Sequence, residues 1–160
     1  MSERAAADTR RMVDVPLRPG GIDLLLVEDS PPELELERIA LAGLQSPDGI
    51  AIARDGEEAL LLLHGPQALR PRLVILDLKL PKVGGADVLE RVKAEPQTHA
   101  VPVVVFTSSD DANDIERCYA LGANGYVIKP LDFQRFQDAV KMLYSYWMGL
   151  NVATSEPARR

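Results

Sequence analysis

Three observations predict an α/β fold in three layers, with a five-stranded parallel sheet between two layers of helices. Five short apolar runs alternate along the chain with five segments of helical periodicity. The runs have the length and the β-branched content of strands that are buried on both faces. Strands that alternate with helices pair in parallel through right-handed crossovers, which gives an open sheet covered on both sides.

Each predicted strand ends at, or just before, a polar residue. The five strands are residues 22–27, 50–53, 73–77, 102–106 and 125–128. Asp77 closes the third strand, and in parallel sheets ligands bind at this carboxyl end of the strands.

The helix after the first strand begins with a capping signal. Ser30 suits the N-cap position, the prolines after it suit the first turn, and Glu33 completes a capping box. Four apolar or small residues share one face of this helix and predict its buried side: Leu36, Ile39, Ala40 and Gly43.

The later helices follow from the same periodicity. Residues 57–64 and 86–94 form the second and third, Asp110 to Asp114 open the fourth, and Asp132 caps the last. The fourth has one shared face, made of Ile115, Cys118, Tyr119 and Gly122. The last has an inward face made of Phe133, Phe136, Val140, Leu143 and Trp147.

Composition restricts the class of protein. The 160 residues are 46% hydrophobic and 26% charged, which is typical of one globular domain. A net charge of −6 argues against nucleic-acid binding, which needs a basic face. The single cysteine, Cys118, excludes an intramolecular disulfide and favours a reducing compartment. With no secretory signal and no membrane-length apolar run, we expect a cytoplasmic protein without a membrane segment.

Three regions are predicted along the chain. Residues 1–21 mix small, charged and turn-forming residues, and we expect a flexible leader there. Residues 22–150 form the domain, and residues 151–160 form a C-terminal tail.

The strand ends bring together residues of one chemistry. Glu28 and Asp29 follow the first strand, Asp77 ends the third, Thr107 follows the fourth, and Lys129 follows the fifth. Three neighbouring carboxylates repel one another unless a cation joins them. All are hard oxygen ligands, so Mg²⁺ is expected, with Mn²⁺ possible. A carboxylate nucleophile, a metal, a lysine and a hydroxyl are the groups needed to phosphorylate an aspartate.

In this order, these motifs resemble the receiver domain of two-component response regulators, over Ile22 to Leu150. The resemblance is carried by Glu28-Asp29, the strand Val74 to Asp77 with Pro81 and Gly85, Thr107 followed by Ser108, and Lys129-Pro130. It implies a flavodoxin-like fold of the chemotaxis-regulator type, with strand order 2-1-3-4-5.

The resemblance also implies a role for each site residue. Asp77 is the expected phosphoacceptor, and Glu28, Asp29, Asp77 and the backbone carbonyl of Lys79 are the expected metal ligands. Lys129 would bind the phosphoryl group, and its bond to Pro130 would be cis. Thr107 would be the switch hydroxyl, and Tyr126 the switch aromatic that turns inward on phosphorylation.

Within the family, the segment from Lys129 to Phe133 and the long last helix ending in Tyr146-Trp147 are similar to single-domain regulators of bacterial phytochromes. This implies a phytochrome-type histidine kinase as the partner. The segment Leu78 to Lys82 fits that group apart from Lys79, where a neutral residue is expected. A second apolar stripe on the last helix, formed by Met142, Tyr146 and Leu150, predicts a homodimer through this helix.

Four functions have to be distinguished for this pattern of residues. The first is a phosphorylated regulator that signals by protein–protein contact, to a downstream partner that the sequence does not identify. A dehalogenase-like phosphatase would need an Asp two residues after Asp77, where Lys79 stands. An FMN-binding protein would need a Ser/Thr/Gly phosphate loop where Glu28-Asp29 stand. A degenerate receiver that acts as a phosphorylation-independent scaffold is the alternative, and the intact acidic residues weigh against it.

Overall fold

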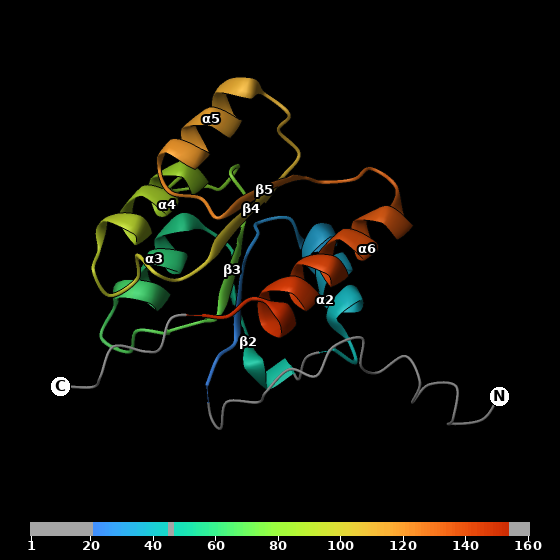
Figure 1. Ribbon diagram of the computed structural model, residues 1–160, viewed down its shortest axis with the longest axis horizontal. Coiled ribbons are helices and arrows are strands. Elements are labelled where there is room, and N and C mark those ends of the chain that lie inside the picture. The colour runs from blue at the N-terminus through green and yellow to red at the C-terminus, as the bar shows by residue number, and fades with distance from the viewer. Residues whose placement is uncertain (1–20, 45–46, 154–160) are drawn as a thin grey trace.

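The computed structural model describes residues 21–44 and 47–153. Five parallel strands form one sheet in the order β2-β1-β3-β4-β5, which confirms the predicted architecture (Figure 1). The strands are β1 (Leu24–Val27), β2 (Ile50–Ala53), β3 (Leu73–Leu76), β4 (Val103–Thr107) and β5 (Gly125–Ile128). The strand order changes direction between β1 and β3, and these two strands pair with Val27 opposite Leu76.

Five α-helices follow the five strands among the described residues. They are α2 (Pro31–Leu41), α3 (Gly56–His64), α4 (Gly85–Ala94), α5 (Ala112–Ala120) and α6 (Phe133–Tyr144). A 3₁₀ turn, η1 (Pro47–Gly49), precedes β2, and α6 continues as a π-helical segment, η2 (Ser145–Leu150). Figure 1 shows α3, α4 and α5 on one side of the sheet and α2 and α6 on the other.

Each side of the sheet has its own apolar core. On the α3–α5 side, Ala59, Leu63, Val88, Leu89 and Cys118 pack against strand residues such as Leu25 and Val105. On the α2–α6 side, Leu34, Leu41, Phe136, Val140 and Met148 pack against strand residues such as Leu26 and Phe106. Strand residues alternate between the two cores because successive side chains point to opposite faces.

Three residues expected on the buried faces of the first and last helices are exposed. Ile39 is 47% exposed, Phe133 is 54% exposed, and Gly43 is exposed in the turn after α2, so these three predictions are wrong. Helix α2 is turned so that Leu34, Glu37 and Leu41 are buried, and the charge of Glu37 hid this pattern in the sequence. Phe133 is the first residue of α6 and lies in its exposed first turn.

The fourth helix differs in a similar way. Tyr119 and Gly122 are exposed, and Cys118 is the buried residue of α5. The helix is only nine residues long, and a side chain one position beyond Cys118 turns away from the sheet.

The leader and tail predicted for residues 1–21 and 151–160 lie outside the described residues, apart from Gly21 and residues 151–153. Across the described part of the chain, the helices are too short or too polar to span a bilayer.

Candidate functional site

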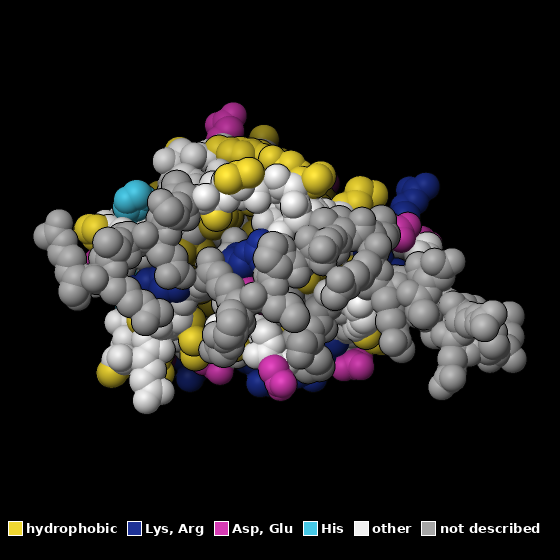
Figure 2. Space-filling view, turned by 60° about the horizontal axis from the view of Figure 1, so that its bottom comes forward, with side chains coloured by type: hydrophobic (Ala, Val, Ile, Leu, Met, Phe, Trp, Pro, Cys, Tyr) yellow, Lys and Arg dark blue, Asp and Glu magenta, His cyan; other side chains and the backbone are white. Residues whose placement is uncertain are grey.

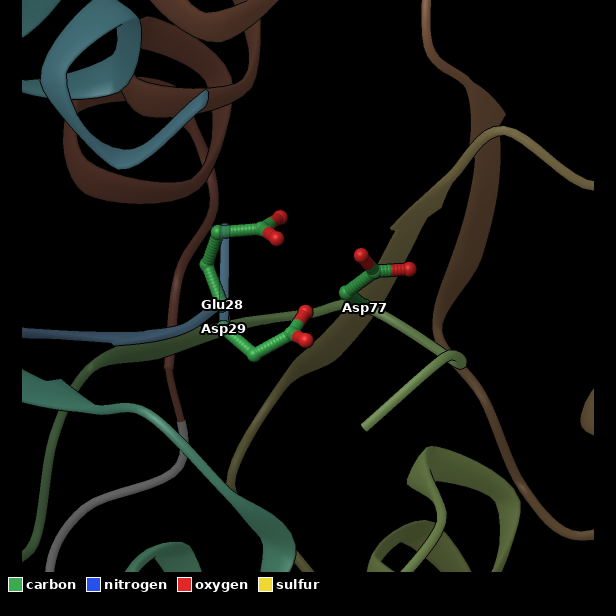
Figure 3. A group of neighbouring side chains, drawn as sticks. All are labelled: Glu28, Asp29 and Asp77. Atoms are coloured by element: carbon green, nitrogen blue, oxygen red, sulfur yellow. The ribbon is translucent and has the colours of Figure 1, made fainter. Parts of the chain in front are cut away.

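The site forms where four strands end at the same edge of the sheet. Glu28 follows β1 and Asp77 follows β3, and these strands are direct neighbours. The backbone N–H of Asp77 donates to the carbonyl of Val27 at 3.0 Å, which fixes the two carboxylates side by side. Figure 3 shows the side chains of Glu28, Asp29 and Asp77 converging on one point. Their ligand oxygens all lie within 4.8 Å of one another.

Lys129 joins this cluster from the end of β5. Its Nζ donates to Glu28 Oε2 at 2.6 Å and to Asp77 Oδ2 at 2.9 Å. Its backbone N–H donates to the carbonyl of Thr107 at 2.7 Å, which holds the lysine beside the last residue of β4. Glu28, Asp77 and Lys129 are all buried. Buried charges need partners of opposite sign, and these three residues supply them to one another.

Glu33 is a third carboxylate on Lys129, which sequence analysis did not place at the site. Its Oε2 lies 3.0 Å from Lys129 Nζ. The capping box predicted at this helix start is only half formed: Ser30 Oγ accepts from the N–H of Glu33 at 3.5 Å. The N–H of Ser30 donates to Glu28 Oε1 at 3.1 Å instead of to Glu33. The buried ammonium attracts the Glu33 carboxylate more strongly than a neutral backbone N–H does.

Burial and charge shift the ionisation of the site. Burial, reinforced by the charge of Asp77, raises the pKa of Glu28 to about 7, although the hydrogen bond from Lys129 acts in the opposite direction. Burial alone would lower the pKa of Lys129, but its bonds to Glu28 and Asp77 outweigh burial and raise that pKa. A negative charge on Glu28 therefore depends mainly on a neighbouring cation, with a smaller contribution from the N–H of Ser30.

Glu37 is a second carboxyl that sequence analysis missed. It lies one turn after Glu33 on α2 and is 2% exposed. Burial, followed by repulsion from Glu28, raises the pKa of Glu37 well above its usual value. The signal in the sequence is its spacing of three and four residues from Leu34 and Leu41, which places it on the buried face.

Thr107 and Tyr126 share a neighbour on the loop after β4. Thr107 is fully buried, and its Oγ1 accepts from the N–H of Ser109 at 3.5 Å. The hydroxyl of Tyr126 donates to the carbonyl of Ser109 at 2.8 Å. Both side chains therefore touch the backbone of the same residue, so a shift of this loop would alter both contacts.

The loop after Asp77 is shaped by close packing. A Cβ at Gly85 would lie 2.2 Å from the carbonyl oxygen of Asp77, so only glycine fits at the start of α4. The exposed Lys79 donates its backbone N–H to Asp77 Oδ1 at 3.3 Å. The peptide bond between Lys129 and Pro130 is trans, so the expected cis bond is wrong. The trans form is the lower-energy state of X–Pro bonds in general.

The donor set fits a hard divalent cation. Three carboxylates from two strand ends face one point, and Asp29 is exposed while Glu28 and Asp77 are buried. A cation there would therefore have protein oxygens on one side and water on the other, an arrangement that Mg²⁺ favours. Such an ion would also relieve the repulsion among the three carboxylates.

Comparison with known proteins agrees with this geometry. The sequence matches the response regulator receiver domain over residues 24–141. The probable methanogenesis regulatory protein FilR2 of Methanothrix harundinacea is 42% identical over 132 residues, which are 80% of this chain and 84% of FilR2.

Two solved structures are similar to this chain in both fold and sequence. The phosphorylated cyanobacterial phytochrome response regulator RcpA has a TM-score of 0.79 at 33% identity, over 84% of this chain and 99% of RcpA. The Mn²⁺-bound response regulator Rcp1, from Synechocystis, has a TM-score of 0.76 at 32% identity, over 82% of this chain and 98% of Rcp1. This chain belongs to the family of response regulator receiver domains.

Proposed function

We propose that this protein is a single-domain response regulator, formed by residues 22–150, that accepts a phosphoryl group from a histidine kinase onto Asp77. The observation that carries the proposal is the buried Asp77 carboxylate between Lys129, 2.9 Å away, and the oxygens of Glu28 and Asp29. The protein is thus a phosphoacceptor, and the only reactions it promotes are its own phosphorylation and dephosphorylation.

The reaction is a displacement at phosphorus. A carboxylate oxygen of Asp77 forms a bond to phosphorus, the bond from phosphorus to the donor breaks, and the donor leaves with the electron pair. Lys129 donates to an oxygen of the incoming phosphoryl group, and the hydroxyl of Thr107 donates to a second phosphoryl oxygen. Glu28, Asp29, Asp77 and the carbonyl of Lys79 would hold Mg²⁺ or Mn²⁺, which would supply positive charge to offset that of the carboxylates and of the phosphoryl group.

Phosphorylation would be transmitted through Thr107 and Tyr126. In the structure, both bind the backbone of Ser109. If Thr107 turns towards a phosphoryl oxygen, it releases Ser109, and the loop that also holds the Tyr126 hydroxyl is free to move. Tyr126 would then turn inward, and the surface formed by α5, β5 and α6 would change.

The similarity to RcpA supports a phytochrome-type kinase as the donor. We propose that the transfer takes place in the cytoplasm. The test is phosphotransfer from a radiolabelled phytochrome histidine kinase to wild type and Asp77→Asn. Label that moves to the wild type alone supports the proposal. If a phytochrome kinase fails but another histidine kinase labels Asp77, the receiver function stands and the phytochrome assignment is wrong.

A homodimer through α6 is the second part of the proposal. A groove of about 490 Å³ runs along this helix, lined by Val127, Arg135, Asp138, Ala139, Met142, Leu143, Tyr146 and Trp147. Met142, Tyr146 and Leu150 are exposed apolar residues on α6 and η2. In a two-fold dimer, Arg135 of one copy can face Asp138 of the other, so the surface is complementary to itself. A protein that stays monomeric at all concentrations in light scattering would contradict this.

We propose that nucleic acid is not a partner, because binding it needs a basic face and the chain is acidic. The lysines and arginines visible in Figure 2 lie among acidic and apolar side chains rather than in one basic area. The formal net charge is −6. We propose that the signal passes by protein contact instead.

A further inference from the structure

The ammonium group of Lys129 has as many carboxylate partners as it has N–H donors. Its Nζ lies 2.6 Å from Glu28, 2.9 Å from Asp77 and 3.0 Å from Glu33. A lysine ammonium has three donors, and all three are engaged. Before the bond to phosphorus forms, Asp77 is still a carboxylate, and an oxygen of the incoming phosphoryl group would find no free donor on Lys129 in this arrangement. One carboxylate must leave before Lys129 can bind the phosphoryl group.

The three partners differ in how easily they can leave. The side chains of Glu28 and Asp77 are 2% and 7% exposed, whereas that of Glu33 is 35% exposed. A buried carboxylate that loses its cation keeps an uncompensated charge in a poorly solvated place. Glu33 can exchange the ammonium for water, because it lies in the first turn of α2 at the rim of the site. It is the partner whose departure costs least.

The local structure at the start of α2 shows what holds Glu33 in place. The Ser30 N–H that a capping box would offer to Glu33 is bound to Glu28 Oε1. Lys129 is the partner that the structure gives for the Glu33 carboxylate. Loss of this one contact therefore frees the side chain without breaking the N-cap bond from the Glu33 N–H to Ser30 Oγ.

We propose that Glu33 is a place-holding carboxylate, which occupies the third donor of Lys129 while Asp77 is free and is displaced by a phosphoryl oxygen when Asp77 is phosphorylated. This inference rests on the proposed function. Glu33 is a positioning residue, since it acts through Lys129 and touches no reacting atom. The same contact ties α2 to the site before phosphorylation and releases it afterwards.

A direct consequence concerns rate. Glu33→Gln removes the competitor for Lys129 and one negative charge that faces an incoming anionic phosphate. Phosphorylation by acetyl phosphate should therefore be faster than in the wild type. We expect about a fivefold increase, the size typical of a partly exposed ion pair.

The experiment follows adduct formation by intact mass, with the full chain, acetyl phosphate and Mg²⁺. The matched control is Glu35→Gln, because Glu35 is exposed on the same helix and loses the same charge. Its rate should stay within about twofold of the wild type, as expected for an isolated surface charge. Glu33→Ala is a second variant that removes the carboxylate without adding an amide, and it should behave like Glu33→Gln.

The salt dependence of the phosphorylation rate distinguishes this role of Glu33 from a purely structural one. The advantage of Glu33→Gln should shrink in about 1 M NaCl, where charges are screened within about 3 Å. If both Glu33 variants match the wild type or are slower, while the wild type still forms its Mg²⁺-dependent adduct, the inference is wrong and the proposed function stands. If the wild type takes a phosphoryl group neither from acetyl phosphate nor from a histidine kinase, the proposed function fails and this inference fails with it.

Discussion

The two sides of the sheet satisfy their buried polar groups in different ways. On the α3–α5 side, Lys93 donates to the carbonyls of His99 and Val101 and to Asn124, and the buried Thr98 donates to the carbonyl of Val92. All these acceptors are uncharged, and every N–H of the Lys93 ammonium and the O–H of Thr98 has one.

On the α2–α6 side, Tyr144 also donates to a neutral group, the carbonyl of Leu44, but other polar groups are charged or lack a partner. Lys129 binds carboxylates at the edge of the sheet, next to α2. Glu37 Oε2 and Gln137 Nε2, on the packed helices α2 and α6, have no hydrogen-bond partner within the described ranges. The stability of this side should therefore depend on pH and on cations, whereas that of the other side should depend on packing.

The largest effect is expected at the charged edge. Lys129→Met leaves Glu28 and Asp77 buried without their cation, which should lower the free energy of unfolding by about 3–5 kcal/mol at pH 8 without metal. Mg²⁺ should restore part of this loss, because it supplies another cation. Urea denaturation with and without Mg²⁺ measures both effects. Equal stability of variant and wild type would contradict the account.

The other side should respond to lost packing instead. Leu89 is fully buried on α4, and Leu89→Ala should cost about 2–5 kcal/mol, with no dependence on Mg²⁺. Leu61→Ala is the control, since Leu61 is 63% exposed on α3 and should cost little. A Leu89→Ala loss that Mg²⁺ reverses would show that the two sides are not separate in this way.

The free energy of unfolding should depend on pH through Glu28, on the α2–α6 side of the sheet. The pKa of Glu28 is about 7 in the folded protein, against 4.5 for an unperturbed glutamate. Because the folded state holds this proton more tightly than the unfolded state does, Glu28 stabilises the fold fully at pH values below 4.5. That contribution is lost as the pH rises through about 7. Without metal, Glu28 alone should lower the free energy of unfolding by about 1 kcal/mol between pH 6 and pH 8. Glu28→Gln should remove this part of the dependence in urea titrations at each pH, whereas the part that comes from the raised pKa of Glu37 should remain.

The stabilisation of the protein by Mg²⁺ should also depend on pH. Mg²⁺ binding requires ionised Glu28, so Mg²⁺ should raise the melting temperature more at pH 8 than at pH 6. A shift that is larger at pH 6 would contradict the assignment of Glu28 as a ligand.

The smallest effect is expected at Glu37. Glu37→Leu replaces a buried carboxyl that has an unpartnered oxygen, and it should stabilise the protein by about 1 kcal/mol. Glu35→Leu, on the exposed side of the same helix, is the matched control and should be close to neutral. A destabilising Glu37→Leu would mean that the carboxyl has a structural role that its contacts do not show.

Much of the fold follows from the sequence, because each strand is a short apolar run with a polar residue at its end or directly after it. The strands β2 and β5 have the predicted bounds, and the Asp132 N-cap of α6 is where the capping rule puts it. The sequence also predicts which site residues lie together, because the carboxyl ends of parallel strands meet at the same edge of the sheet. These residues are Glu28, Asp29, Asp77 and Lys129.

The contacts of α2 could not be predicted. Glu33 fits a capping box, and only the position of Lys129 across the site shows that its carboxylate has a stronger partner. Glu37 is charged, so a hydrophobic pattern leaves it out, although it faces the core. Both depend on how α2 is rotated against the sheet, which is a tertiary property.

The most direct test of the account is phosphorylation of the isolated protein by a small donor. Wild type and Asp77→Asn would be incubated with acetyl phosphate or phosphoramidate, with and without Mg²⁺, and read by intact mass. The account predicts a phosphoryl adduct in the wild type that requires Mg²⁺ and is lost in Asp77→Asn. An adduct that persists in Asp77→Asn would contradict Asp77 as the phosphoacceptor. A wild type that binds Mg²⁺ and stays unmodified by either donor would favour a phosphorylation-independent scaffold.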